Sequence, residues 1–146
     1  MSPRGADLQP KSLLAQDWQV REFVKHYRRI AIVGLPADEN SEPMLRARRL
    51  LAYDFEIFPV HSDCDKLLGR TCSPHLDAIR GSIDIVVVLP TAGVSLLHVA
   101  TEAIKKRVKV FWVEEAPLGE ELARLLTQEG IHVVAERSLE QEFAKL

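Results

Sequence analysis

Hydrophobic positions are concentrated in five short runs along the chain, each followed by a more polar stretch. The runs are rich in Val, Ile and Phe, which favour β-strands. The third and fourth runs are nearly continuous rather than alternating, a pattern typical of strands buried on both faces of a sheet. Five strands are therefore predicted, at residues 30–35, 55–60, 83–89, 108–113 and 131–135.

The segments between and around these runs carry apolar residues at helical spacing. Strands that alternate with helices in this way predict crossover connections and a parallel sheet. The expected fold is a three-layer, Rossmann-like, doubly wound α/β domain with a five-stranded parallel sheet. Helices are predicted at residues 12–29, 45–52, 94–106, 119–129 and 139–145, with a further short helix at 63–68.

The length of 146 residues fits one domain, expected over residues 12–146, behind a poorly ordered segment at 1–11. The net charge of −2 argues against a sequence-independent grip on nucleic acid. No apolar run is long enough to cross a bilayer, so no membrane association is expected, and the N-terminus lacks the apolar core of a secretory signal. With only two cysteines, a cytoplasmic protein with free thiols is the expectation.

The carboxyl ends of parallel strands meet at one edge of a sheet, where ligands of open α/β folds bind. The first strand ends at Gly34, which lets another group approach the backbone, and the following helix would present free N–H groups to an anion. The dinucleotide fingerprint G-x-G-x-x-G is missing, because positions 36 and 39 are Pro and Glu. An NAD(P) site is therefore disfavoured.

Several arginines follow the strand-end loops, and Arg46 is among those best placed to reach a phosphate. Arginines in such positions also commonly belong to a solvated face, and this alternative stays open. The group consists of Arg46, Arg48, Arg49 and Arg70.

His61, Cys64, Cys72 and His75 follow the spacing H-x2-C-x7-C-x2-H, which invites a zinc hypothesis. The pattern crosses a turn-rich connection, and short motifs of this kind often mislead. No metal site is therefore predicted.

Glu114 and Glu115 form an acidic pair at the end of the fourth strand, where a general base could lie. Adjacent residues of a strand point to opposite faces, so the two carboxylates cannot both face one substrate. The chain also lacks a nucleophile elbow. No catalytic residues are predicted.

The order of six motifs resembles the small stand-alone CoA-binding proteins, which share their fold with the CoA-binding domain of the succinyl-CoA synthetase α subunit. The resemblance extends from about Trp18 to Ser138, and the order and spacing of the motifs are fairly specific. The motifs are "IAIVGLP", "FEIFPVHSD", "KLLGRTCSPHLDAI", "SIDIVVVLPTAG", "AIKKRVKVFWVEE" and "EGIHVVAERSLE".

The resemblance implies a small-molecule ligand, CoA or an acyl-CoA, whose ADP part lies across the strand ends. The loop after the first strand would approach the diphosphate, the end of the second would lie by the nucleotide, and the third and fourth ends would form the opposite wall. In that order, the implied contacts are Gly34, Leu35 and Pro36, then Val60 and His61, then Leu89, Pro90 and Thr91, and finally Val113 and Glu114.

Several polar positions depart from the usual pattern of these proteins. Glu42 stands in "SEPML", where Arg or Lys, Pro and Ser are usual, and "PVHS" replaces the common "PVNP". The leading hypothesis is non-catalytic binding of CoA or acyl-CoA. The alternatives are a protein-interaction module that has kept the fold and lost the ligand, and an NAD(P)-binding domain. An exposed sheet edge or an apolar helix face would allow a homodimer.

Overall fold

The structure of the protein, a computed structural model, describes residues 13–62, 64–89 and 94–146. Its centre is a five-stranded sheet in which every neighbouring pair of strands is parallel. The order β2-β1-β5-β6-β7 places the first strand beside the third of the sheet, so the chain changes winding direction between β1 and β5. The strands are β1 (Arg29–Val33), β2 (Glu56–Val60), β5 (Ile85–Val88), β6 (Val110–Glu114) and β7 (His132–Arg137).

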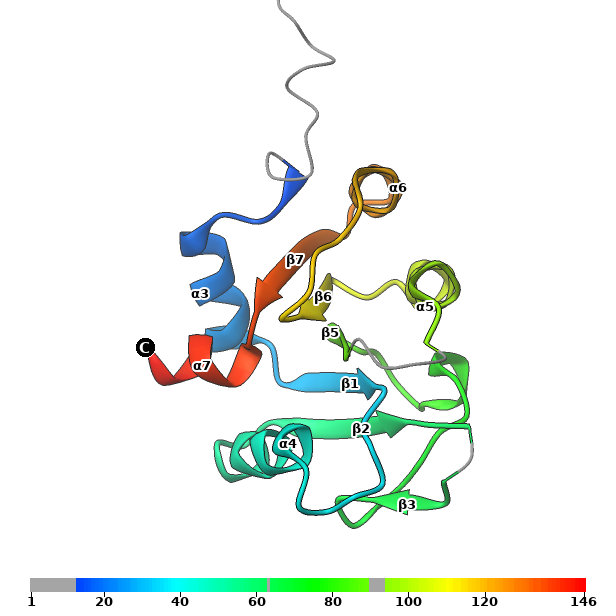
Figure 1. The fold of residues 1–146 in the computed structure, drawn as a ribbon. Coiled ribbons are helices and arrows are strands. Elements are labelled where there is room, and N and C mark those ends of the chain that lie inside the picture. Colours follow the sequence, from blue (N-terminus) through cyan, green and yellow to red (C-terminus); the bar gives the residue numbers. More distant parts are fainter. Residues whose placement is uncertain (1–12, 63, 90–93) are drawn as a thin grey trace, which may run out of the picture.

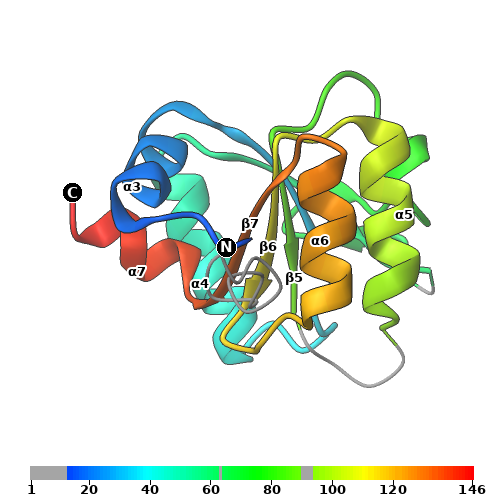
Figure 2. The same cartoon turned by 90° about the horizontal axis from the view of Figure 1, so that it is seen from above.

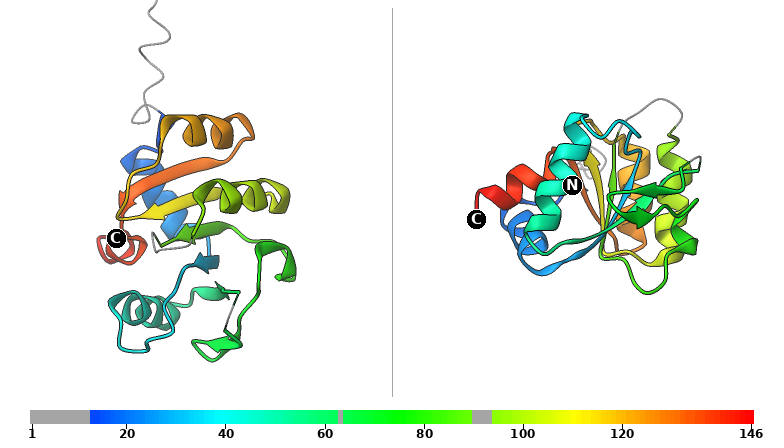
Figure 3. Two further views of the ribbon diagram at one scale, coloured as in Figure 1. Left: turned by 45° about the vertical axis from the view of Figure 1, so that its right-hand side comes forward. Right: turned by 90° about the horizontal axis from the view of Figure 1, so that it is seen from below.

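Helices cover both faces of this sheet (Figures 1 and 2). One face carries α3, α4 and α7, and the other carries α5 and α6, which lie side by side in Figure 3. The expected three-layer, Rossmann-like α/β fold is thereby confirmed. The helices are α3 (Asp17–His26), α4 (Glu42–Ala52), α5 (Leu96–Lys106), α6 (Glu120–Gln128) and α7 (Leu139–Ala144), with the short 3-10 helix η1 (Leu76–Ala78).

Alternation along the buried strands divides the core into two layers. Ile30 and Ile32 of β1 pack toward α3 and α4, whereas Ala31 and Val33 pack toward α5. In β6, Trp112 lies in the first layer and Phe111 in the second, and both side chains are fully buried. Because both layers draw on the same strands, the strand sequences are almost continuously apolar.

The predicted short helix at 63–68 is wrong. Two-residue strands, β3 (Lys66–Leu67) and β4 (Arg70–Thr71), pair there in antiparallel fashion. Leu68 and Gly69 connect them with φ of 57° and 72°, and two successive positive φ values are the mark of a tight type I′ hairpin turn. Turn chemistry thus overrides the helical spacing. Asp63 lies outside the described residues.

Pro59 lies inside β2, at the edge of the sheet. Its carbonyl oxygen accepts a hydrogen bond from Ser73 N–H at 2.9 Å on the side away from β1. The proline nitrogen points to that same outer side, so the missing N–H costs no bond to β1. The edge is also partly covered, because His61 N–H donates to Ser73 O at 2.9 Å.

Three predictions fall on parts of the chain that the structure does not describe. They concern the order of residues 1–11 and the ligand contacts of Pro90 and Thr91. Among the described residues, none of the helices has both the length and the apolar character needed to span a membrane.

Candidate functional site

Two of the hollows lined by described residues lie near the carboxyl ends of the strands. The larger is an open cleft of about 530 Å³ beside α5, and the smaller is a cavity of about 20 Å³ beneath α4 and α7. Leu35 lines both. The cleft is in the size range of small-molecule sites, whereas the cavity has room for about one water molecule.

The cleft is built from the loops after β1 and β2 and from the start of α5. It opens at the change in winding direction between β1 and β5, where doubly wound sheets bind ligands. Gly34 has φ of 99°, a conformation that L-residues avoid, so the chain can turn directly after β1. Ser95 caps α5, because its Oγ accepts a hydrogen bond from His98 N–H at 3.2 Å.

Five of the predicted ligand contacts come together in this cleft: Gly34, Leu35, Pro36, Val60 and His61. Sequence reasoning missed the α5 side of it. Ser95, His98 and Glu102 line the cleft, and their spacing along the predicted helix at 94–106 already placed them on one helical face. The other lining residues that were not predicted are Val33, Ser62, Pro74, Val94 and Val99.

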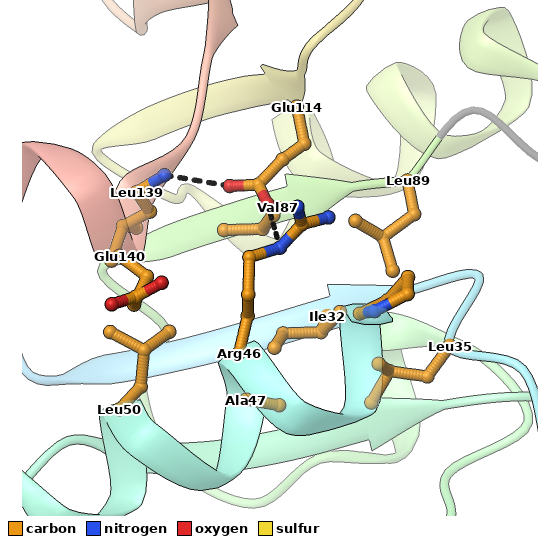
Figure 4. Close-up of a pocket in the computed structure, with 11 residues that line it drawn as sticks. Ile32, Leu35, Arg46, Ala47, Leu50, Val87, Leu89, Glu114, Leu139 and Glu140 are labelled. Atoms are coloured by element: carbon orange, nitrogen blue, oxygen red, sulfur yellow. Dashed lines mark hydrogen bonds and ion pairs between the residues drawn. The ribbon is translucent and has the colours of Figure 1, made fainter. Parts of the chain in front are cut away.

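Arg46, Leu89 and Glu114 lie in the smaller cavity (Figure 4). Glu114 is almost fully buried, and its Oε2 accepts a hydrogen bond from Leu139 N–H at 2.7 Å. Its Oε1 lies 3.7 Å from Arg46 Nε. This carboxylate therefore joins β6, α4 and the start of α7, and the structure does not bring it together with the cleft residues.

Val113, the other predicted contact among the described residues, also lies apart from the cleft lining. Val113 is fully buried in the core layer beneath α5 and α6. The arginines expected near phosphates are paired with carboxylates instead. The pairs are Arg46 with Glu115 at 2.8 Å, Arg48 with Glu39 at 3.8 Å, Arg49 with Glu140 at 3.2 Å and Arg70 with Glu56 at 3.2 Å.

The sequence pattern of the CoA binding domain matches residues 28–144, which include all five strands of the sheet and four of its helices. The chain belongs to the CoA-binding domain family. This CoA-binding domain is 29% identical over 116 residues to the YneT protein of Bacillus subtilis (strain 168), covering 80% of this chain and 85% of YneT.

Solved structures show the same architecture. A protein from Pyrococcus horikoshii OT3 superposes on this CoA-binding domain with a TM-score of 0.80 and 26% identity, over 90% of this chain and 92% of that one. The dinucleotide-forming acetyl-coenzyme A synthetase 1 of Ca. Korarchaeum cryptofilum, in complex with phosphate and ADP, has a TM-score of 0.61 and 23% identity. That match covers 77% of this chain and 27% of the synthetase, and it shows a shared fold.

Burial is the main cause that raises the pKa of the Glu114 carboxyl in this CoA-binding domain. The hydrogen bond from Leu139 N–H and the charge of Arg46 act in the opposite direction without cancelling it. The folded chain therefore holds the Glu114 proton more tightly than the unfolded chain does. The stability due to this group is then greatest below the unfolded-state pKa of about 4.3, and it is lost as pH rises through the folded-state pKa.

Glu114→Gln keeps an oxygen acceptor for Leu139 N–H and carries no charge at any pH. The difference in unfolding free energy, wild type minus variant, is expected to decrease as pH is raised from 4 toward 7, because only the wild type must bury a charge. Urea denaturation at unit pH intervals measures it. Glu121→Gln, at an exposed position in the first turn of α6, is the control; its difference should not decrease as pH rises, because a negative charge is favoured at the start of a helix. If the difference in unfolding free energy for Glu114→Gln instead increased with pH, the pKa of Glu114 would not be raised in the folded chain.

The zinc pattern is not assembled in the structure. Within the described parts of the chain, no three His, Cys, Asp or Glu side chains come together in a group able to hold a metal ion. Cys64 Sγ–H donates to Lys66 O at 3.1 Å, and Cys72 is buried. Burial, followed by a hydrogen bond with the Cys64 side chain, raises the pKa of the Cys72 thiol to about 11.

Cys72 is therefore expected to react slowly with iodoacetamide at pH 8. A pKa of about 11 lowers the thiolate fraction more than a hundredfold relative to an ordinary cysteine at about 8.5, and the greater intrinsic nucleophilicity of the thiolate restores only part of this. We expect the alkylation of Cys72 to be at least tenfold slower in the folded chain than in urea. Peptide mass spectrometry at successive times measures both rates. Equal rates in the two states would show that the thiol is neither buried nor suppressed.

Proposed function

We propose that this CoA-binding domain binds CoA or an acyl-CoA in the open cleft formed by the loops after β1 and β2 and the start of α5. One observation carries the proposal. Gly34, with φ of 99°, opens a cleft of about 530 Å³ at the β1–β5 switch point in a chain of the CoA-binding domain family. A backbone without a Cβ at this position lets a diphosphate approach closely.

The role proposed is binding without catalysis. Polar side chains in the described cleft lining are a few histidine, serine and glutamate groups, without a cysteine or lysine nucleophile among them. The buried Glu114 is engaged with Leu139 N–H and Arg46 in the other cavity. A domain of this kind would hold or sense its ligand rather than convert it.

The test is calorimetric titration of the purified protein with CoA, acetyl-CoA, dephospho-CoA and NAD in parallel. We expect saturable binding of CoA and acetyl-CoA and little or no heat with NAD. The described cleft lining offers no arginine or lysine for the 3′-phosphate, so dephospho-CoA should bind within about threefold of CoA. Acetyl-CoA recovered after the titration should remain intact by chromatography.

Absence of both heat and a thermal shift with every CoA ligand would overturn the proposal. That outcome would favour a protein-interaction module that keeps the fold without the ligand. Tight NAD binding, with weak CoA binding, would instead assign the cleft to a dinucleotide. Release of free CoA from acetyl-CoA would contradict the non-catalytic role alone.

A further inference from the structure

Two histidines supply the basic side chains of the described cleft lining. His61 follows β2, and His98 lies in the first turn of α5. Among the described lining residues, the one acidic group is Glu102, and arginine and lysine do not occur. The loop after β1 contributes Gly34, Leu35 and Pro36, none of which has an ionisable side chain. The ionisable side chains of the described cleft lining are therefore the two histidines and Glu102.

Both histidines line the cleft, and the backbone of each is fixed by a hydrogen bond. His61 N–H donates to Ser73 O at 2.9 Å, and His98 N–H donates to Ser95 Oγ at 3.2 Å. The His98 side chain is 73% exposed, and its Nε2 lies 4.0 Å from Glu102 Oε2. The His98 ring can therefore turn between Glu102 and a ligand in the cleft without disturbing α5.

A diphosphate placed in this cleft needs a counter-charge. The arginines of α4 point to other carboxylates, and Glu102 would repel a phosphate whenever its charge is unmatched. A protonated imidazole donates charge-assisted hydrogen bonds to phosphate oxygens and offsets the glutamate charge. Histidine is also the side chain whose charge ordinarily changes between pH 5 and 8.

We propose that His98, with His61, contacts the diphosphate of the bound ligand, so that the cleft binds it more tightly when these histidines are protonated. This inference rests on the proposed function. It makes His98 a specificity-determining residue that replaces the lysine or arginine expected at a phosphate site. The ligand class is then a pyrophosphate-linked nucleotide, held by its diphosphate rather than by a fixed cation at a third phosphate.

Dephospho-CoA is the suitable probe because it lacks the 3′-phosphate of CoA. That phosphomonoester titrates near pH 6, so its own change of charge would add to the pH dependence expected from the histidines. Titration calorimetry at pH 6 and pH 8 should show about tenfold tighter binding at pH 6, on the scale of one charged hydrogen bond. Repeating the pH 7 titration in two buffers of different ionisation enthalpy should reveal net proton uptake on binding.

The variants assign the effect to His98. At pH 8, His98→Gln should bind dephospho-CoA as tightly as the wild type does. At pH 6, this variant should lack most of the increase in affinity that the wild type shows. His98→Lys should bind dephospho-CoA tightly at both pH values. His26→Gln is the matched control, because His26 is a 66% exposed helical histidine beside Glu22 on α3, away from the cleft. A thermal melt of each variant, read alongside the titrations, identifies any loss of folding.

The outcomes separate the two proposals. Binding of dephospho-CoA that is equally tight at pH 6 and 8, without proton uptake, overturns the role of the histidines and leaves the proposed function in place. A pH dependence that His98→Gln retains in full also overturns the role of His98. Failure of any CoA ligand to bind at either pH overturns the proposed function itself.

Discussion

Replacement of Trp112 by alanine is expected to lower the free energy of unfolding by about 3–5 kcal/mol, the range for removing a buried aromatic side chain. Trp112 lies on β6, an interior strand of the sheet between β5 and β7, and is fully buried. Its Nε1–H donates to Arg137 O at 2.9 Å, at the end of β7. The variant would leave a cavity between the sheet and the helices α3, α4 and α7. It would also remove one of the two hydrogen bonds that Arg137 O accepts, the other coming from Glu115 N–H at 3.3 Å.

Urea denaturation followed by far-UV circular dichroism measures this loss, because removing Trp112 would also change the fluorescence signal. Trp112→Phe should cost less than Trp112→Ala, since it keeps most of the apolar volume and loses the hydrogen bond. Trp18→Ala is the matched control. That side chain is 56% exposed on α3 and should change stability by no more than about 0.5 kcal/mol. Similar losses for the two alanine variants would show that Trp112 does not anchor the core.

Apolar patterning was sufficient to predict the sheet. Each predicted strand corresponds to one of the five observed strands, because a strand covered on both faces requires an unbroken apolar run. The pattern failed at 63–68, where a hairpin replaces the expected helix. A two-residue turn depends on the φ angles of Leu68 and Gly69, and the apolar pattern contains no information on φ.

The candidate site could be predicted only in part. Gly34 and His61 were predicted because the carboxyl ends of neighbouring parallel strands must meet. Glu114 also ends a strand, yet its side chain shares the face of Trp112, whereas the Val113 side chain points toward α5 and α6. The sequence shows that these neighbours point to opposite faces. Which face forms the cleft depends on how the helices are distributed over the sheet.

Arg46 was among the predicted ligand contacts, yet it lines the smaller cavity and not the cleft. Its place after a strand-end loop suggested a phosphate ligand, but α4 turns it toward the Glu114–Glu115 pair. An ion pair between residues about seventy positions apart forms only once the fold has brought β6 beside β5 and α4 across the sheet. Conversely, His98 was overlooked because a histidine in an amphipathic helix has no local signature of a ligand contact.

Gly34→Asp is expected to weaken CoA binding at least thirtyfold, if the cleft is used as proposed. Gly34 has φ of 99°, so any side chain strains the backbone by about 1–3 kcal/mol. An aspartate would also place a negative charge where the diphosphate approaches. Two unit charges about 4 Å apart near a protein surface repel by up to about 4 kcal/mol. Calorimetric titration with CoA measures the combined effect.

Gly34→Asn separates the two causes, because asparagine has nearly the shape of aspartate, tolerates positive φ at least as well and carries no charge. We expect the Asn variant to bind CoA at least tenfold more tightly than the Asp variant. This ratio of affinities should decrease in high salt, because salt screens the charge of the aspartate. If the two variants bind equally weakly while both remain folded in a thermal melt, the loss comes from strain in the loop after β1. If both bind like the wild type, the ligand does not approach Gly34, and the cleft beside α5 is not the CoA site.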